Sequence, residues 1–313
     1  MTTKNKIALS LVLHNEAAHI PRLAEAIKKF TVKPAGIFVT DNSSTDDSPE
    51  LIKKFFPEAH VHIHEGNPGY GTAHNINMRN AFSGDADAVV ILNTDTEPDV
   101  RCLTVVDEVI NSRPEIGIIA PVILYGNENG KTSIIQDFRT NVDFKLGRIN
   151  NMDEGEDINS PDLPAFEKVN YFSGSACVIT KETFEKTGGF DETNFLYGEE
   201  MDYSYRVSVN NIAIVAVKDA RVWHYHDWSE KNIDGLCREY YYINRNRIRY
   251  FKKFRLKKGL ALFVLNEIVI SPARLWWTMR KGGKRFTYYF YLGIIHGLKN
   301  KTEILSELSG YPG

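Results

Sequence analysis

The sequence is poor in cysteine, which excludes two kinds of site. The chain of 313 residues contains 3 cysteines, Cys102, Cys177 and Cys237, and they lie far apart. Zinc sites built from cysteine need closely spaced pairs, and disulfide frameworks need more cysteines in a shorter chain. Neither kind of site is indicated, and we expect a reducing, cytoplasmic compartment.

Long apolar runs without charge are also missing. The run from Ile7 to Leu13 is short and has no small-residue cleavage site after it, so it favours a buried strand over a secretion signal. The segment GLALFVLNEIVISPARLWWTM, residues 259–279, has the length to span a bilayer but contains Glu267 and Arg274. We interpret it as interfacial, because charges at bilayer depth are costly.

Charge is unevenly distributed along the chain. The formal net charge is -2, yet residues 238–301 carry 16 of the 38 Lys and Arg residues and 2 of the 40 acidic residues. These basic residues alternate with apolar and aromatic runs, a combination that suits an anionic membrane surface better than nucleic acid. We expect no nucleic-acid partner. The alternative is a pair of helices packed on the rest of the chain or on a second subunit of a homo-oligomer.

Four short apolar runs alternate with stretches of helical periodicity. The runs are IALSLVL, GIFVT, VHIH and AVVILN, and residues 20–30, 49–56, 72–82 and 100–112 follow them. Such runs separated by helices predict an α/β fold with a mostly parallel sheet covered on both faces. Ser48 before Pro49 fits a helix cap followed by a first-turn proline. Residues 126–164 are polar and irregular, which predicts a surface excursion or a weak hairpin.

Polar residues follow each of these runs. The groups are His14-Asn15-Glu16, Asp41-Asn42-Ser43-Ser44, Asn67-Pro68-Gly69-Tyr70-Gly71 and Asn93-Thr94-Asp95. Any one group is typical of turns and helix caps. Four in succession indicate a binding site, because ligands of open α/β sheets bind beyond the carboxyl ends of the strands.

Together these segments resemble the nucleotide-sugar half of a family 2 glycosyltransferase with the GT-A fold. The pieces LVLHNEA, VTDNSSTDDS, NPGYGTAHN and ILNTDTEPD stand in the family's order. The likeness continues through YFSGSACVITKETFEKTGGFDETNFLYGEEMDYSYRV and VWHYHDWSEKN to YYYINRNRIRY. It implies a Rossmann-like GT-A domain over 1–232, with a nucleotide-sugar half at about 1–125 and an acceptor half at about 165–232. A basic, aromatic helical region, 233–313, would follow.

The resemblance also implies which residues hold a nucleotide-sugar donor. They are His14, Asn15, Glu16, Asp41, Asn67, Gly69, Asn75, Asn93, Thr94 and Asp95. Asp41 would accept hydrogen bonds from the nucleobase, and Asn67 and Asn75 would hold the nucleoside and sugar around a glycine-rich turn. Asp95 would bind a divalent cation that bridges the two phosphates. Its alternative role is to cap the helix that follows.

One departure from the family concerns the metal. Many relatives have two or three aspartates at this motif, whereas Asn93-Thr94-Asp95 supplies one carboxylate. Another protein ligand is then needed, and the resemblance implies His224 of VWHYHDW, with His226 as the alternative. Ligation by one Asp and one His favours Mn over Mg.

An acidic pair follows a Gly-Gly-Phe-Asp turn. In FLYGEEMDYSYR, Glu199, Glu200 and Asp202 open a predicted helix, where the helix dipole favours carboxylates even without a catalytic reason. The family pattern implies that Glu200, the second acid, is the catalytic base, with Glu199 as the alternative. Asp202 would orient the helix or bind the acceptor, and Arg206 stands one turn further on to pair with it.

The resemblance therefore implies a metal-dependent, inverting transferase. It would move a sugar from a nucleoside diphosphate to a hydroxyl of a glycan or lipid-linked glycan in cell-surface polysaccharide synthesis, at the inner face of the membrane. The NTD motif favours dTDP-rhamnose as donor, and VWHYHDWSEKN with YYINRNR makes UDP-galactofuranose the next candidate. A sugar nucleotidyltransferase would carry a glycine- and lysine-rich loop, which LVLHNEAAH lacks. A non-catalytic nucleotide-sugar binding module is the other alternative.

Overall fold

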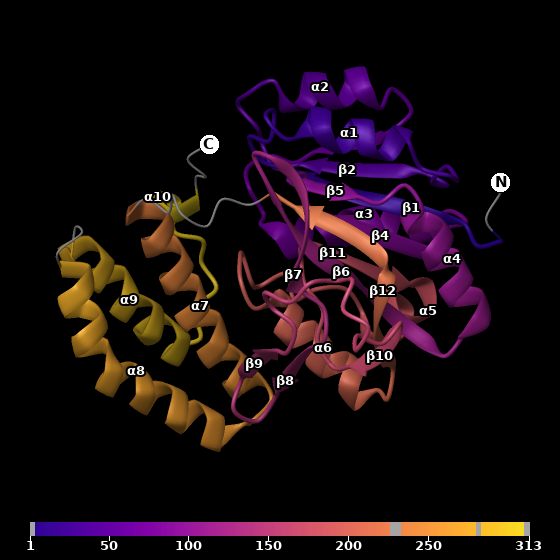
Figure 1. Cartoon of the computed structure of the whole chain (residues 1–313). Coiled ribbons are helices and arrows are strands. Elements are labelled where there is room, and N and C mark those ends of the chain that lie inside the picture. The colour runs from indigo at the N-terminus through magenta and orange to yellow at the C-terminus, as the bar shows by residue number, and fades with distance from the viewer. Residues whose placement is uncertain (1–3, 226–232, 280–282, 310–313) are drawn as a thin grey trace.

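The computed structural model describes residues 4–225, 233–279 and 283–309. Figure 1 shows a central sheet covered by helices, with a separate group of long C-terminal helices beside it. The α/β class with a mostly parallel sheet, flanking helices and a helical C-terminal region, expected from the sequence, is confirmed. His226, the alternative metal ligand, lies outside the described residues.

Ten strands of the described residues form the central sheet, in the order β10-β12-β6-β11-β4-β1-β2-β3, with β5 on β12 and β7 on β6. Strands β3, β2, β1 and β4 are parallel, β11 is antiparallel to both β4 and β6, and β12 is parallel to β6. The strands are β1 (Ile7–Leu13), β2 (Ile37–Asp41), β3 (His60–Ile63), β4 (Ala88–Leu92), β5 (Thr96–Pro98), β6 (Ile116–Asn127), β7 (Gly130–Asp137), β10 (Phe166–Val169), β11 (Ala176–Thr180) and β12 (Ala213–His224), and β8 (Thr140–Asp143) with β9 (Arg148–Asn151) forms a separate pair.

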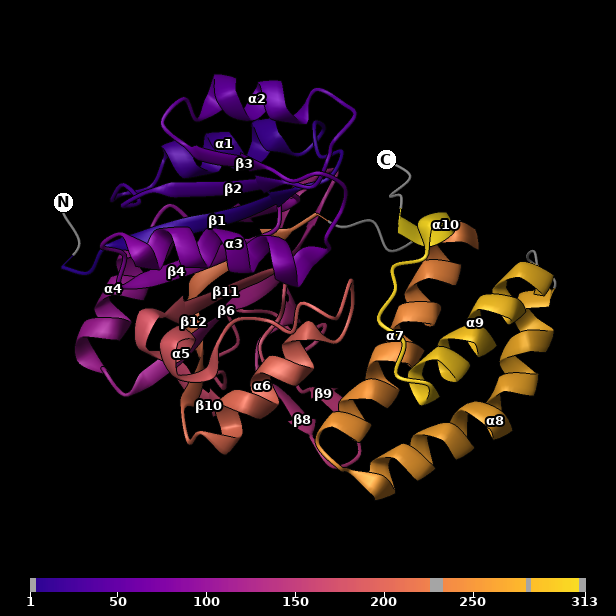
Figure 2. The same ribbon diagram turned by 180° about the vertical axis from the view of Figure 1, so that it is seen from behind.

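The helices lie on both faces of the sheet and beside it. Figure 2 shows α3 crossing in front of β1 and β4, with α7, α8 and α9 standing apart from the sheet. The helices are α1 (Ile20–Lys28), α2 (Ser48–Phe55), α3 (Tyr70–Ser83), α4 (Cys102–Ser112), α5 (Lys181–Thr187), α6 (Glu199–Val209), α7 (Ile233–Lys253), α8 (Lys257–Met279), α9 (Gly283–Leu298) and α10 (Ser306–Ser309).

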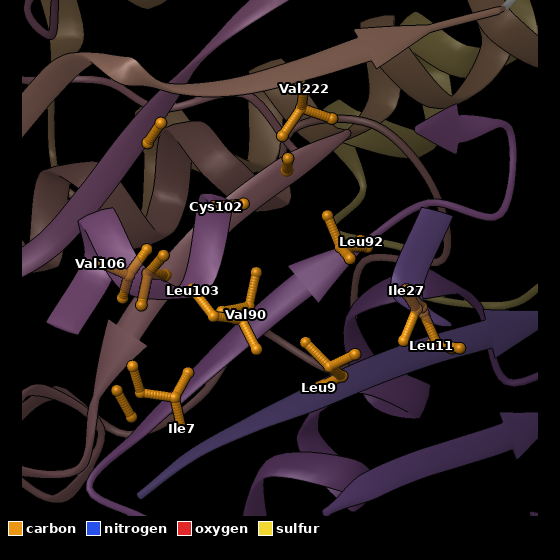
Figure 3. Packing of buried hydrophobic residues seen from close by; sticks show 14 of the residues in the cluster. Ile7, Leu9, Leu11, Ile27, Val90, Leu92, Cys102, Leu103, Val106 and Val222 are labelled. Atoms are coloured by element: carbon orange, nitrogen blue, oxygen red, sulfur yellow. The ribbon is translucent and has the colours of Figure 1, made fainter. Parts of the chain in front are cut away.

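Two apolar cores form because successive strand residues point to opposite faces. On one face, Leu9 and Val90 pack with helix residues such as Leu103 (Figure 3). On the other face, Ala8 and Val89 pack with residues that include Met78 of α3. Burial on both faces explains why the sequence shows continuous apolar runs where an alternating pattern would mark a half-exposed strand.

A small polar network fixes α3 against the sheet. The Ser10 hydroxyl lies 2.7 Å from His74 Nδ1, and Asn77 donates to Ser10 Oγ at 3.0 Å. The Thr40 hydroxyl donates to Asn77 Oδ1 at 2.8 Å. Burial lowers the pKa of His74 to about 3, so this ring is neutral. The network sets the height of α3 and with it the position of the glycine-rich turn at its start.

Local signals located the first four helices to within two residues at either end. The expected cap was wrong in detail, because α2 begins at Ser48 itself and Asp47 takes the cap position. Ser48 Oγ instead accepts a hydrogen bond from the Glu16 amide at 2.7 Å. Residues 126–164 contain the end of the β6–β7 hairpin and the β8–β9 hairpin, so the expected hairpin, one of the two alternatives for this segment, is confirmed.

The C-terminal helices pack on one another at close range. A side chain at Gly293 of α9 would overlap the backbone of Tyr241 in α7, and one at Gly297 would lie 2.9 Å from the Arg245 carbonyl oxygen. Glycine thus lets the two helix backbones approach each other. No helix in the described part of the chain has the length and apolar character to cross a membrane.

Replacing Gly293 by alanine should therefore destabilise the protein, by about 1–3 kcal/mol for an overpacked contact. A loss of stability would point to close packing, because alanine is by itself a better helix former than glycine by about 1 kcal/mol. The measurement is the free energy of unfolding in denaturant. Ile295→Ala, on the exposed side of the same helix, is the control and should change stability little. A Gly293→Ala protein as stable as the wild type would contradict the close packing.

Candidate active site

The carboxyl ends of three parallel strands meet at one edge of the sheet and bring the predicted polar groups together. His14, after β1, lies with Nδ1 2.8 Å from the carbonyl oxygen of Asn42, after β2. The Thr94 hydroxyl, after β4, donates to Glu16 Oε2 at 2.6 Å. The loops that follow β1, β2 and β4 are thus joined directly.

The remaining predicted donor residues extend this edge. Asn15 Oδ1 accepts from the Thr45 amide at 2.8 Å, which fixes the loop after β2. Asn67 Oδ1 accepts from the Asn42 side-chain amide at 3.2 Å and from the Gly69 backbone amide at 3.0 Å. The first, second and third polar groups of the sequence therefore form one connected surface.

Gly69 is a position where only glycine fits. Its φ is 90°, in the left-handed region, and a Cβ there would overlap the carbonyl oxygen of Phe195. The next residue, Tyr70, donates its amide to that same oxygen at 3.2 Å. The glycine-rich turn predicted to hold the donor thus also abuts the loop that precedes the acidic pair.

Asp41 and Asn75, two further predicted donor residues, also form hydrogen bonds within the protein. Asp41 is 1% exposed and accepts a hydrogen bond from the Ser44 amide at 3.2 Å. The Asn75 amide donates to Phe190 O at 2.9 Å and accepts from Phe190 N at 2.8 Å, so it holds the Gly-Gly-Phe-Asp turn. Contacts of Asp41 and Asn75 with a nucleotide sugar stay predictions.

Strand pairing brings Asp95 and His224 together from distant parts of the sequence. Strand β5 pairs with β12, so that Thr96 lies opposite His224. The two side chains approach with His224 Nε2 3.2 Å from Asp95 Oδ2. On its other side, His224 Nδ1 lies 3.1 Å from Gln136 Oε1 of β7. A histidine whose second ring nitrogen is held by an outer partner has the arrangement of a metal ligand.

Asp95 and His224 fit a divalent cation that takes its other ligands from a substrate. Ligand atoms about 2.1 Å from one ion lie about 3 Å apart, which agrees with the observed Nε2–Oδ2 distance of 3.2 Å. Within residues 4–225, 233–279 and 283–309, no group of three or more His, Cys, Asp or Glu side chains could hold a metal. The pair alone would leave several coordination positions for phosphate oxygens and water.

A cavity of about 870 Å³ lies beside these residues. Its wall includes Asn93 after β4, His224 at the end of β12, Glu199 and Glu200 from α6, and Arg247 from α7. The hairpin segment also contributes, through residues such as Gln136. The predicted metal ligand His224 and the predicted acidic pair thus line the same cavity, and the C-terminal helical region completes its wall.

The acidic pair opens α6 after Gly198, whose φ of 96° reverses the chain direction. Glu199 is 1% exposed, and its Oε1 accepts no hydrogen bond from any residue that the structure describes. Burial, together with the charge of Glu200, raises the pKa of Glu199 well above its ordinary value. Burial also raises the pKa of Glu200. Both shifts favour retention of a proton on the pair, and Glu199 is the more buried of the two side chains.

Glu200 sits against a second glycine. A Cβ at Gly174 would overlap Glu200 Oε1, and the Tyr70 hydroxyl donates to the Gly174 carbonyl at 2.6 Å. This glycine, in the FSGSA segment before β11, leaves room for the carboxylate beside the backbone. The sequence reasoning did not single out Gly174, although its place between two serines before a buried strand was visible.

Asp202 is not among the residues that line this cavity. Arg206 donates to Asp202 Oδ1 at 2.7 Å, which confirms the expected pairing one turn along the helix. The other oxygen pairs with Lys253 of α7, which also binds Asp191. Asp202 therefore ties α6 to α7 and positions the acidic pair, and a direct catalytic role for it stays a prediction.

Known proteins are similar to this chain in sequence. The family model described as Glycosyl transferase family 2 matches residues 11–172, just over half of the chain. The N-acetylglucosaminyl-diphospho-decaprenol L-rhamnosyltransferase of Mycobacterium tuberculosis is 25% identical over 68% of this chain and 74% of its own length. A low-salt glycan biosynthesis hexosyltransferase of Haloferax volcanii is 23% identical over 89% of this chain and 88% of its own length.

The fold is also found among solved structures. The crystal structure of GalNAc-T7 with UDP, GalNAc and Mn²⁺ superposes with a TM-score of 0.63 at 16% identity. The match covers 95% of this chain, which spans 58% of the length of that protein. The GT-A fold expected from the sequence is thereby confirmed.

Proposed function

This chain belongs to glycosyl transferase family 2 and is a glycosyltransferase, and we propose that it moves a hexosyl residue from a nucleoside diphosphate sugar to an acceptor hydroxyl. The observation that supports this function most directly is that His224 and the Glu199–Glu200 pair line one cavity. The acceptor is a glycan or a lipid-linked glycan. The family removes the alternatives of a sugar nucleotidyltransferase and a non-catalytic binding module.

A divalent cation, Mn²⁺ in preference to Mg²⁺, would be held by Asp95 and His224. When bound, it neutralises the diphosphate leaving group of the donor. The distance of 3.2 Å between His224 Nε2 and Asp95 Oδ2 supports this assignment, as does the Mn²⁺ in the GalNAc-T7 crystal structure. Gln136 keeps the histidine ring in the orientation that directs Nε2 toward Asp95.

Glu200 takes the proton of the acceptor hydroxyl as that oxygen attacks the anomeric carbon. The hydroxyl approaches from the face opposite the leaving nucleotide, so the sugar is transferred with inversion. A raised pKa brings a carboxylate closer to the basicity that proton abstraction requires near neutral pH. The proton that the pair retains is assigned to Glu199, because Glu199 is the more buried of the two side chains.

For the donor, we favour dTDP-rhamnose, with UDP-galactofuranose as the second candidate. The Asn93-Thr94-Asp95 motif supports rhamnose, and the Mycobacterium tuberculosis relative is named as an L-rhamnosyltransferase. Support for galactofuranose comes from VWHYHDWSEKN and YYINRNR alone. The name of the same relative describes an acceptor sugar joined to a lipid through a diphosphate, which supports a lipid-linked acceptor here.

The C-terminal helices would hold the enzyme at the inner face of the cell membrane. Four apolar residues of α8, spaced by three, four and seven positions, are more than half exposed: Leu262, Leu265, Val269 and Trp276. Exposed apolar residues on one side of a helix, beside basic residues such as Lys257 and Lys258, suit an anionic lipid surface. A second copy of the chain is the alternative occupant of this stripe.

Removal of either metal ligand should weaken metal-dependent donor binding. We expect Asp95→Ala and His224→Ala each to lower donor affinity at least tenfold with Mn²⁺ present, because one of the two protein ligands is lost. Calorimetric titration with the nucleotide sugar measures this loss. His62→Ala, which removes an exposed histidine from β3, is the control. Full transfer activity in excess chelator would contradict metal dependence.

Glu200→Gln should lower turnover about 100-fold to 10,000-fold, the usual contribution of a general base, and leave donor affinity nearly unchanged. Glu199→Gln is the matched control and should cost much less, because glutamine resembles the protonated acid. In the wild type, transfer should fall as pH falls through the Glu200 pKa, which burial raises above 4.5. A larger loss for Glu199→Gln would assign the base to the other carboxylate.

Association with vesicles tests the membrane proposal. The protein should sediment with anionic vesicles, less so as salt rises and less so with neutral lipid. Leu265→Ser with Val269→Ser should weaken sedimentation, because the two changes remove apolar side chains that are 58% and 65% exposed. Val209→Ser, at an exposed position on α6, is the control. Absence of vesicle binding together with a concentration-dependent dimer would assign the stripe to a protein contact.

A further inference from the structure

Arg247 is a cavity-lining arginine without a hydrogen-bonding partner in the described part of the chain. Its guanidinium lies 5.6 Å from the centre of the Phe263 ring of α8, and no hydrogen bond or ion pair of a described residue reaches it. The arginines on either side along α7 are anchored. Arg245 donates to Glu303 O at 2.8 Å, and Arg249 donates to Asn194 Oδ1 at 2.8 Å.

The surroundings of Arg247 leave its charge only partly compensated. Burial lowers its pKa, while Tyr171, Glu267 and Tyr250 act in the opposite direction. Arginine nevertheless stays protonated in proteins, since its pKa lies so far above neutrality. A half-buried guanidinium that lacks hydrogen-bond acceptors has lost part of its hydration without replacement. An anion that entered the cavity would supply those acceptors.

Most charged side chains in the cavity wall are acidic, which makes the position of Arg247 distinctive. Glu199, Glu200, Asp137 and Glu154 all contribute to the wall, and Arg247 is the one Lys or Arg among the described residues that line it. Glu200 and Arg247 both influence the pKa of Tyr171, and all three residues line this cavity. A ligand that placed a hydroxyl at Glu200 could therefore place an anionic group at Arg247.

We propose that Arg247 binds the phosphate of an acceptor whose sugar is joined to a lipid through a diphosphate. This inference rests on the proposed function and specifies its acceptor class. The planar guanidinium matches phosphate oxygens in a two-point contact. The phosphates of the donor have their own site at Asp95 and His224, which leaves Arg247 for the acceptor.

The position of the lipid follows from α8. Phe263, the residue beside Arg247, belongs to the helix that carries the exposed stripe of Leu262, Leu265, Val269 and Trp276. A shallow groove next to this stripe is lined by Leu260, Ala261 and Val264. An acceptor anchored at Arg247 thus has an apolar surface along α8 for its chain, on the side of the molecule proposed to face the bilayer.

Binding of geranyl diphosphate in the presence of chelator tests the inference without any transfer reaction. Geraniol is the uncharged comparison, and the chelator removes binding through a metal. We expect the wild type to bind the diphosphate, Arg247→Met to weaken that binding roughly tenfold to hundredfold, and Arg247→Lys to weaken it less. Lys53→Met, which removes one exposed positive charge from α2, is the control and should bind like the wild type.

Transfer kinetics give the second measurement. N-acetylglucosamine on a short prenyl diphosphate is compared with its octyl glycoside, and Arg247→Met should raise the KM for the diphosphate acceptor only. No diphosphate binding by the wild type, equal binding by Arg247→Met, or a loss of donor affinity in that variant would overturn the inference. Each of these results leaves the proposed function intact, which instead fails if the wild type neither transfers the sugar nor hydrolyses the donor.

Discussion

Two adjacent buried carboxyl groups cannot both be ionised, and the site depends on this constraint. Glu199 and Glu200 open the same helix turn, and burial penalises the charge of each. Their mutual repulsion favours one proton on the pair, and Glu199 is the more deeply buried member. The result is a single carboxylate with raised basicity at the cavity wall. A protein that used one isolated glutamate would have to raise its pKa by burial alone.

The chain holds this pair from several directions. The loop before it is fixed by Asn246 of α7, which donates to the carbonyl oxygens of Leu196 and Tyr197 at 2.8 Å. Behind the pair, Asp202 joins Arg206 to Lys253. Both arrangements use α7, so the C-terminal helical region belongs to the site as well as to the proposed membrane surface.

The sequence located those parts of the site that local patterns mark. Polar groups after apolar runs located the strand ends, because the end of a buried strand is itself a local feature. Asp95 and His224 were paired through the family resemblance, and the structure brings them to 3.2 Å through the β5–β12 contact. Gln136 and Arg247 were not found. Gln136 lies in a hairpin without regular periodicity. Arg247 is one of several basic residues on α7, and it differs from its neighbours only because it has no hydrogen-bonding partner among the described residues.

The proposed acceptor contact would give the acidic body and the basic C-terminal region of the chain complementary roles in one cavity. The strand ends and α6 supply carboxylates, which suit a cation and an acceptor hydroxyl but repel phosphate. A phosphate-bearing acceptor therefore needs a positive group from elsewhere, and α7 supplies Arg247 at the cavity wall. The same helical region continues into the exposed apolar stripe of α8. One group of helices therefore carries both the proposed phosphate contact and the proposed membrane surface.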